Sequence, residues 1–139
     1  MKYLLDTNLC IYIIRHPRSR TAARFETIPD EDVVISTVVA GELLAGPMRK
    51  KRPPVDAMAV DEFLQTAAAL PFDMDCARVF AAISAAIIDA GTPVGGLDLA
   101  IAATAIHHGL TVITHNQRDF GKIPGLQYED WQQEEDPAP

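Results

Sequence analysis

The sequence predicts one three-layer α/β domain with a mostly parallel sheet of about five strands, and three observations lead to this fold class. Short apolar segments that favour strands alternate with longer segments that favour helices, which is typical of parallel strands joined by crossover helices. The length of 139 residues suits one domain with a buried core. The hydrophobic fraction of 48% indicates a globular fold and not a disordered chain.

The amino-terminal segment predicts a strand followed by two helices. Residues 2–5 are apolar without alternation, as expected for a central parallel strand that is covered on both faces. Asp6-Thr7-Asn8 are good capping residues for an apolar helix at 9–14, and a second helix is expected at 19–27. A single residue does not separate a plain capping role for Asp6 from a functional one.

The rest of the chain continues the alternation of strands and helices. The expected elements are a strand at 33–35, a helix at 38–45, a helix from Asp56 to 69, an edge strand at 70–72, a helix at 76–90 capped by Asp75, a helix at 97–108, a strand at 111–114, a polar loop at 115–119 and a last strand at 126–131. We therefore expect one domain over residues 1–131 and a disordered acidic tail at 132–139.

Composition excludes several classes of protein. No apolar run has the length of a membrane span, and the start MKYLLDTN lacks the features of a secretory signal, so we expect a cytoplasmic protein without membrane association. Cys10 and Cys76 are far apart and have no CxxC neighbours, which favours reduced, buried thiols over a zinc site or a disulfide.

The charge distribution leaves two interpretations open. The net charge of −7 argues against non-specific coating of nucleic acid. Eight of the twelve Lys and Arg nevertheless lie in two segments, Arg15 to Arg24 and Arg49 to Arg52. These segments are either ordinary solvated surface or two positive banks beside an acidic site that could hold a phosphate backbone.

Four carboxylates, here called the acidic quartet, are candidates for chemistry. Asp6 and Asp119 each follow a predicted strand, and ligands of an open α/β sheet bind at that edge. Glu42 and Asp98 are isolated charges among apolar helix residues, where a carboxylate is costly unless something pairs with it. If the four meet, a hard divalent ion such as Mg²⁺ would relieve their repulsion, activate water and neutralise charge on a phosphodiester.

Competing chemistries find little support in the sequence. There is no GxxxxGK[ST] phosphate loop, no GxGxxG turn and no GxSxG nucleophile turn. His107 and His108 are adjacent on a helix and make a poor pair of ligands, while His16 and His115 are surface candidates without an assigned role.

Four motifs together resemble the PIN-domain ribonucleases, specifically the VapC-type toxins of type II toxin–antitoxin systems. The motifs are LLDTN at 4–8, VISTVVAGELLAG at 34–46, GGLDLAIAATA at 95–105 and GLTVITHNQRDF at 109–120. Each motif is weak alone, but their order and spacing in a chain of this length make the resemblance specific. It covers nearly all of residues 1–131.

The resemblance assigns roles to individual residues. Asp6, Glu42, Asp98 and Asp119 match the family's acidic positions, with Asp6 and Asp98 most directly associated with the metal, and Thr7, Thr114 and Asn116 match its supporting positions. It implies a PIN-like sandwich and RNA cleavage that depends on Mg²⁺ or Mn²⁺. The expected RNA contacts are Arg15, Arg49, Lys50, Lys51, Arg52 and Arg118.

The resemblance also implies partners. They are a homodimer mate and a cognate VapB-type antitoxin, in a heterotetramer or a larger assembly, with operator DNA bound only through the antitoxin. The amino-terminal motif resembles the enteric-type members that cut tRNA in the anticodon region. Two alternatives remain at this point: a non-catalytic PIN-fold binding module whose acids are helix caps, and a hydrolase of small phosphoesters.

Overall fold

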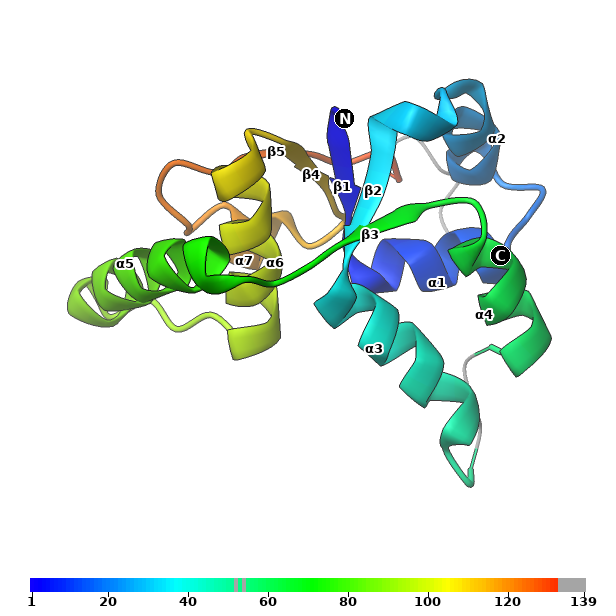
Figure 1. Ribbon diagram of the computed structural model, residues 1–139, viewed down its shortest axis with the longest axis horizontal. Coiled ribbons are helices and arrows are strands. Elements are labelled where there is room, and N and C mark those ends of the chain that lie inside the picture. The colour runs from blue at the N-terminus through cyan, green and yellow to red at the C-terminus, as the bar shows by residue number, and fades with distance from the viewer. Residues whose placement is uncertain (52, 54, 133–139) are drawn as a thin grey trace.

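The fold is an α/β/α sandwich around a five-stranded sheet, seen here in a computed structural model that describes residues 1–51, 53 and 55–132 (Figure 1). All strand pairs are parallel, and the strand order is β3-β2-β1-β4-β5. The strands are β1 (Tyr3–Leu5), β2 (Val33–Ser36), β3 (Ala68–Leu70), β4 (Thr111–Ile113) and β5 (Gln127–Glu129). The predicted fold class is confirmed.

The first strand of the chain is the centre of the sheet. Tyr3 pairs with Val33 of β2 on one side and with Thr111 of β4 on the other. Leu4 and Leu5 are fully buried, as expected for a strand that helices cover on both faces. Every strand that neighbours β1 therefore ends at the same edge of the sheet as Asp6.

Helices cover both faces of the sheet. One group consists of α1 (Thr7–Arg15), α2 (Arg20–Thr27), α3 (Thr37–Ala45) and α4 (Ala57–Leu64), and the other of α5 (Met74–Ala90) and α6 (Gly96–His108) (Figure 1). Three short helices complete the fold: η1 (Asp30–Asp32), η2 (Gly46–Met48) and α7 (Gln117–Phe120). The side chains of Asp6, Ser19, Ser36, Asp56 and Asp73 each accept a backbone hydrogen bond at the start of a helix, which satisfies a donor that the helix leaves free.

Helix α6 lies between the sheet and α5. Its residues 99–105 are all buried, and alanine occupies four of these seven positions. Small side chains let α5 pack closely against α6, and Gly109 ends α6 in the left-handed conformation (φ 67°) that its position after the last turn requires. The result is a rigid support for the first turn of α6, where Asp98 lies.

Several predicted boundaries were wrong. Helix α4 ends at Leu64 and not at 69, because the Thr66 hydroxyl and amide both bond to the Phe63 carbonyl and turn the chain. Strand β3 therefore occupies Ala68–Leu70 and not 70–72, although it is an edge strand as predicted. Asp73, and not Asp75, caps α5.

The carboxyl-terminal segment returns to the amino-terminal half of the fold. The Trp131 ring meets Tyr3 edge-on with centroids 5.3 Å apart, and the Arg24 guanidinium lies 4.8 Å from the centroid of the Trp131 ring. Strand β5 is shorter than the predicted 126–131. The predicted tail lies outside the described residues from position 133 onward.

Two expectations from composition are also addressed by the structure. Cys10 and Cys76 are buried and are not joined by a disulfide. Within residues 1–51, 53 and 55–132, no helix has the length and apolar character needed to cross a membrane.

Candidate active site

The acidic quartet comes from four elements that meet at the carboxyl edge of the central strands. Asp6 follows β1, and Glu42 lies in α3, the helix after β2. Asp98 lies in the first turn of α6, and Asp119 lies in α7, just after β4. Helices α1, α3 and α6 all begin at this end of the sheet (Figure 1).

Asp6 is the most buried member of the quartet, with 4% of its surface exposed. One carboxylate oxygen accepts the Leu9 amide at 2.8 Å, so Asp6 does cap α1. The other accepts the Thr114 hydroxyl at 2.5 Å. The pKa of Asp6 is raised from 3.8 to about 6: burial is the main cause, the hydrogen bonds from Thr114 and Leu9 offset part of it, and the negative charges of Asp98 and Glu42 add to it. Capping and a functional role are therefore compatible in one side chain.

Glu42 is held by the residue that follows Asp6. The Thr7 hydroxyl donates to Glu42 Oε1 at 2.5 Å, which links the first residue of α1 to α3. Both side chains are half-buried. The hydrogen bond turns Glu42 toward Asp6, and the two carboxylates repel each other.

Asp98 is half-buried beside Asp6, Glu42 and Asp119. Burial raises its pKa, and the negative charges of Asp119 and Glu42 add to the rise. Its position in the first turn of α6 places a carboxylate near the positive end of the helix dipole.

Asp119 is the member with the most polar support. Asn116 donates from Nδ2 to Asp119 Oδ2 at 3.1 Å and accepts the Asp119 amide at 3.3 Å. Lys122 Nζ lies 3.5 Å from Asp119 Oδ1. The Asn116 hydrogen bond lowers the pKa of Asp119, and the positive charges of Lys122 and Arg118 lower it further.

These mutual charge effects show that the quartet forms one negatively charged cluster. Asp6 responds to Asp98 and Glu42, and Asp98 responds to Glu42 and Asp119. The acids after β1 and at the start of α6 therefore lie on the same side of the molecule. The sequence alone could not establish that the four carboxylates lie close together, because their proximity depends on the strand order of the sheet.

The carboxylate oxygens of the quartet are spread apart. In the part of the chain that the structure describes, the only group of three Asp, Glu, His or Cys ligand atoms within 4.8 Å of one another is Asp73, Asp75 and His107, and it does not belong to the quartet. This exposed trio has simpler explanations, since Asp73 caps α5 and Asp75 forms a 3.9 Å surface pair with His107.

The donor set of the quartet fits a hard divalent cation. All four side chains offer carboxylate oxygens. Burial is the main cause that raises the pKa of Asp6 and of Asp98, and the negative charges of the other acids, which a cation would neutralise, add to the rise. A looser ring of acids suits Mg²⁺, which keeps several of its waters and binds through few carboxylates. Soft-metal chemistry does not fit here, because neither thiol nor imidazole belongs to the set.

The basic residues predicted to contact RNA lie on the surface. Arg15, Arg49, Lys50, Lys51 and Arg118 are exposed, and Arg52 lies outside the described residues. Arg15 lines a hollow of about 340 Å³ between the end of α1 and the start of α4, and Pro53, which follows the second basic segment, also lines it. The hollow is therefore bordered by Arg15 of the first basic segment and by residues that follow the second basic segment in the chain.

Two residues near the site were missed by sequence reasoning. Lys122 pairs with Asp119, and Asp130 contacts the loop before α7. Asp130 directly follows a strand, as Asp6 does, and this signal could have identified it. The predicted strand at 126–131 placed it inside the strand instead.

Comparisons with known proteins agree with this architecture. The PIN domain profile matches residues 3–126. The tRNA(fMet)-specific endonuclease VapC of Salmonella typhimurium is 34% identical over 131 residues, which cover 94% of this chain and 98% of that protein. Ribonuclease VapC2 of Rickettsia felis is 31% identical over 132 residues, with coverage of 94% and 98%.

Solved structures give the same result. The crystal structure of DNA-bound VapBC from Salmonella typhimurium contains a chain that superposes with a TM-score of 0.87 at 34% identity, covering 94% of this chain and 98% of that chain. VapBC2 from Rickettsia felis, bound to a DNA fragment from its promoter, gives a TM-score of 0.85 at 28% identity, with coverage of 94% and 99%. The chain therefore belongs to the PIN-domain family, and within that family it is of the VapC type.

Proposed function

We propose that this chain is a divalent-metal-dependent endoribonuclease and the toxin component of a type II toxin–antitoxin module, acting in the cytoplasm. The observation that carries the proposal is the meeting of the acidic quartet at one edge of the sheet, with the pKa of Asp6 raised to about 6 by burial and by its acidic neighbours. The names of the relatives, tRNA(fMet)-specific endonuclease and ribonuclease, support RNA as the substrate and a tRNA as the first candidate.

Asp6 and Asp98 would hold Mg²⁺ or Mn²⁺, and Glu42 and Asp119 would complete the pocket. The bound ion supplies a site that activates water and neutralises charge on the scissile phosphate. The chain's own task is to hold these acids ionised and correctly oriented. The Thr114 hydroxyl and the Leu9 amide lower the pKa of Asp6, so that most of its carboxylate is charged at neutral pH. Thr7 and Asn116 orient Glu42 and Asp119.

The exposed cations are proposed to bind the RNA backbone. Arg15 and Pro53, which directly follows the second basic segment, border one hollow, which supports a track for phosphates between the end of α1 and the start of α4. Arg118 is next to Asp119 in α7, so it is the predicted cation nearest to the quartet in sequence. The net charge of −7 disfavours non-specific binding, so selectivity should come from RNA shape.

The partners are proposed from the solved complexes. Relatives are found as VapBC assemblies, some of them bound to DNA, which supports a cognate VapB-type antitoxin and a homodimer within a heterotetramer or larger assembly. The acidic net charge of this chain supports DNA contact through the antitoxin alone.

Cleavage of RNA by purified protein tests the enzymatic proposal. A tRNA(fMet) transcript and a pool of total RNA are incubated with Mg²⁺, with Mn²⁺ or with EDTA, and the fragment ends are sequenced. We expect cleavage only with metal, and a loss of about a hundredfold or more in Asp6→Asn and in Asp98→Asn, since each removes a charge from the metal pocket.

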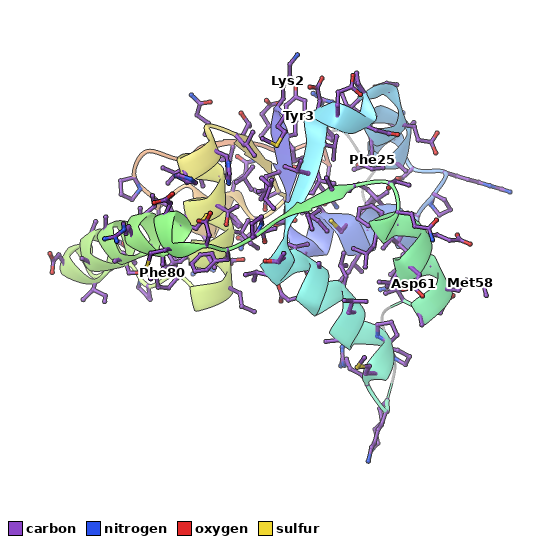
Figure 2. All side chains as sticks on the ribbon, in the orientation of Figure 1. Lys2, Tyr3, Phe25, Met58, Asp61 and Phe80 are labelled. Carbon is purple, nitrogen blue, oxygen red and sulfur yellow. The ribbon has the colours of Figure 1, made fainter. Side chains whose placement is uncertain are left out.

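Asp61→Asn is the matched control for these variants. Asp61 is an exposed acid of α4, on the side of the molecule away from α5 and α6 (Figure 2). The Asp61→Asn variant should cleave RNA at the same rate as the wild type. Equal cleavage by folded wild type, Asp6→Asn and Asp98→Asn would refute the role of the quartet, and no metal-dependent cleavage at all would favour the non-catalytic binding module.

A further inference from the structure

A buried carboxylate that has no part in the proposed chemistry contacts the loop after β4. We infer that Asp130 is a positioning residue for the acidic quartet and that it fixes residues 114–119 at the edge of the sheet. The inference rests on the proposed ribonuclease function and extends it to a residue outside the predicted site.

Three donors converge on the Asp130 carboxylate. His115 Nδ1 lies 2.9 Å from Asp130 Oδ2, and Gln117 Nε2 donates to the same oxygen at 3.1 Å. The Gln132 amide donates to Oδ1 at 2.8 Å. Because a carboxylate only accepts, Nδ1 of His115 carries the hydrogen in this contact.

The sheet explains why Asp130 reaches this loop. Strands β4 and β5 are parallel neighbours, with Ile113 in register with Glu129, and the Thr114 amide donates to the Glu129 carbonyl at 3.0 Å. The residues that follow the two strands therefore emerge side by side. Asp130, the first residue after β5, therefore lies beside the first residues of the loop that follows β4.

Burial makes these contacts more than surface pairing. The Asp130 side chain is only 4% exposed, while the His115 side chain that it holds is 62% exposed. A carboxylate removed from water is costly unless hydrogen-bond donors satisfy it. The loop is therefore stabilised in the conformation in which His115 and Gln117 donate to Asp130. Exposed pairs of the same length would impose much less order.

The two side chains that Asp130 holds flank Asn116, which orients the site. Asn116 donates its amide to Thr114 Oγ1 at 2.9 Å and its side chain to Asp119. Thr114 in turn donates to Asp6. Asp130 thus holds the loop on both sides of Asn116, and hydrogen bonds run from Asn116 to Asp119 and, through Thr114, to Asp6.

The functional consequence concerns the orientation of Asp6 and Asp119. A polar surface loop without such an anchor would sample several conformations, and both acids would lose their fixed positions. Partners of this kind around metal-binding side chains change metal affinity or activity by about 10- to 100-fold when they are removed. Asp130 itself need not contact RNA or metal for this effect.

The experiment compares Asp130→Asn and Asp130→Ala with the wild type and with Glu129→Gln. Glu129 is the matched control because it precedes Asp130, is exposed and directs its side chain to Arg24. Cleavage of the tRNA(fMet) transcript is measured with saturating Mg²⁺. Mn²⁺ affinity is measured by electron paramagnetic resonance, and the His115 tautomer by two-bond ¹H–¹⁵N correlation.

We expect kcat to fall about 10- to 100-fold in both Asp130 variants, with KM for the transcript close to that of the wild type. We also expect the affinity for Mn²⁺ to weaken in both Asp130 variants. A defect in folding alone would lower the amount of active protein and leave the Mn²⁺ affinity of the folded fraction unchanged. The signal of His115 protonated at Nδ1 should be lost in Asp130→Ala. Glu129→Gln should match the wild type in every measurement. Wild-type kcat and Mn²⁺ affinity in both Asp130 variants would overturn the inference.

Two further outcomes are decided by the same design. If the wild type cleaves no RNA, the proposed function fails, and the Mn²⁺ affinity decides the inference about Asp130. A weaker Mn²⁺ affinity in Asp130→Ala than in the wild type supports the inference. An equal affinity, or no Mn²⁺ binding by the wild type, overturns it. If Asp130→Ala does not fold, the double variant His115→Ala/Gln117→Ala is measured instead. This variant removes the two side chains that donate to Asp130 from the loop and leaves the Gln132 contact in place. A lower kcat and a weaker Mn²⁺ affinity then support the inference, and wild-type values overturn it.

Discussion

Thr114 and Asp6 are 108 positions apart in the chain, and the Thr114 hydroxyl donates a 2.5 Å hydrogen bond to the Asp6 carboxylate. The same hydroxyl accepts the Asn116 amide, and Asn116 holds Asp119. One threonine therefore connects the acid that follows β1 with the acid that follows β4. Because Thr114 is fully buried, water cannot replace this contact.

Thr114→Val should shift the pH dependence of cleavage. The Thr114 hydrogen bond lowers the pKa of Asp6, so its removal should raise that pKa above about 6 and move the acidic limb of the pH–kcat profile toward higher pH. Thr104→Val is the matched control, since Thr104 is equally buried but bonds to Ala100 of its own helix. An acidic limb that stays in place in folded Thr114→Val would contradict the coupling.

Asp6→Asn should stabilise the metal-free protein at neutral pH. The pKa of Asp6 rises on folding from its ordinary value of 3.8 to about 6, so the folded state binds this proton more tightly. The stability that this group contributes is therefore fully present below pH 3.8 and lost as the pH rises through 6, which amounts to roughly 3 kcal/mol at most. The variant retains one oxygen to accept the Leu9 amide.

Denaturant unfolding in EDTA measures this effect. We expect Asp6→Asn to unfold at a higher denaturant concentration than the wild type at pH 7.5, and the difference to shrink toward pH 4. A wild type that is the more stable protein at pH 7.5 would show that ionised Asp6 is not a source of strain.

Mg²⁺ or Mn²⁺ should raise the melting temperature of the wild type at pH 7.5. A ligand at a hundred times its Kd adds about 2.7 kcal/mol of stability, and the gain should be much smaller in Asp98→Asn. The double variant Asp75→Asn/His107→Ala tests the exposed trio with Asp73 and should keep the full gain. A gain lost in that double variant and kept in Asp98→Asn would place the ion at the trio.

Lys122→Gln should tighten Mn²⁺ binding with little change in stability. Lys122 Nζ lies 3.5 Å from Asp119 Oδ1 and lowers the pKa of Asp119, so it competes with a cation for that carboxylate. The pair is partly exposed, and its loss should change the free energy of unfolding by less than about 1 kcal/mol. Titration by electron paramagnetic resonance measures the affinity, and weaker binding in the variant would assign Lys122 a supporting role instead.

Replacement of Arg49, Lys50 and Lys51 by glutamine should weaken RNA binding and flatten its salt dependence. Each lost phosphate contact should reduce the slope of log K against log salt by about 0.7 for single-stranded RNA. Lys2→Gln/Arg78→Gln is the control. Lys2 lies at the amino end of the sheet, opposite the site (Figure 2), and Arg78 is an exposed residue of α5, which covers the other face of the sheet from α3 and α4. Binding is measured with catalytically inactive Asp98→Asn as the background, and an unchanged slope would place this segment away from the RNA.

Sequence reasoning identified the residues that meet, but not the contacts that hold them. Asp6 and Asp119 could be predicted at one edge of the sheet because both follow predicted parallel strands. Glu42 and Asp98 could be identified as candidates because a lone charge in an apolar helix needs a partner. Their meeting depends on the strand order, which the pattern of elements does not encode.

The remaining errors have local physical causes. Asp73 and Asp75 are equally good helix caps by residue type, and only the path of the backbone selects Asp73. Strand β3 consists of Ala68, Ala69 and Leu70, whose composition does not favour a strand, so tertiary pairing with β2 decides its position. Asp130 was missed because a strand boundary shifted by two residues concealed that it directly follows β5.

The central place of β1 has a consequence for biosynthesis. Strand β1 leaves the ribosome more than 100 residues before β4, its neighbour from residue 111 onward, and the middle of the sheet can close only when both are present. Until that point a nascent polypeptide carries Asp6 without Thr114 or Asp119, and its catalytic edge is incomplete. A ribosome that translates this chain therefore meets the complete acidic edge only after residue 119 has left the exit tunnel.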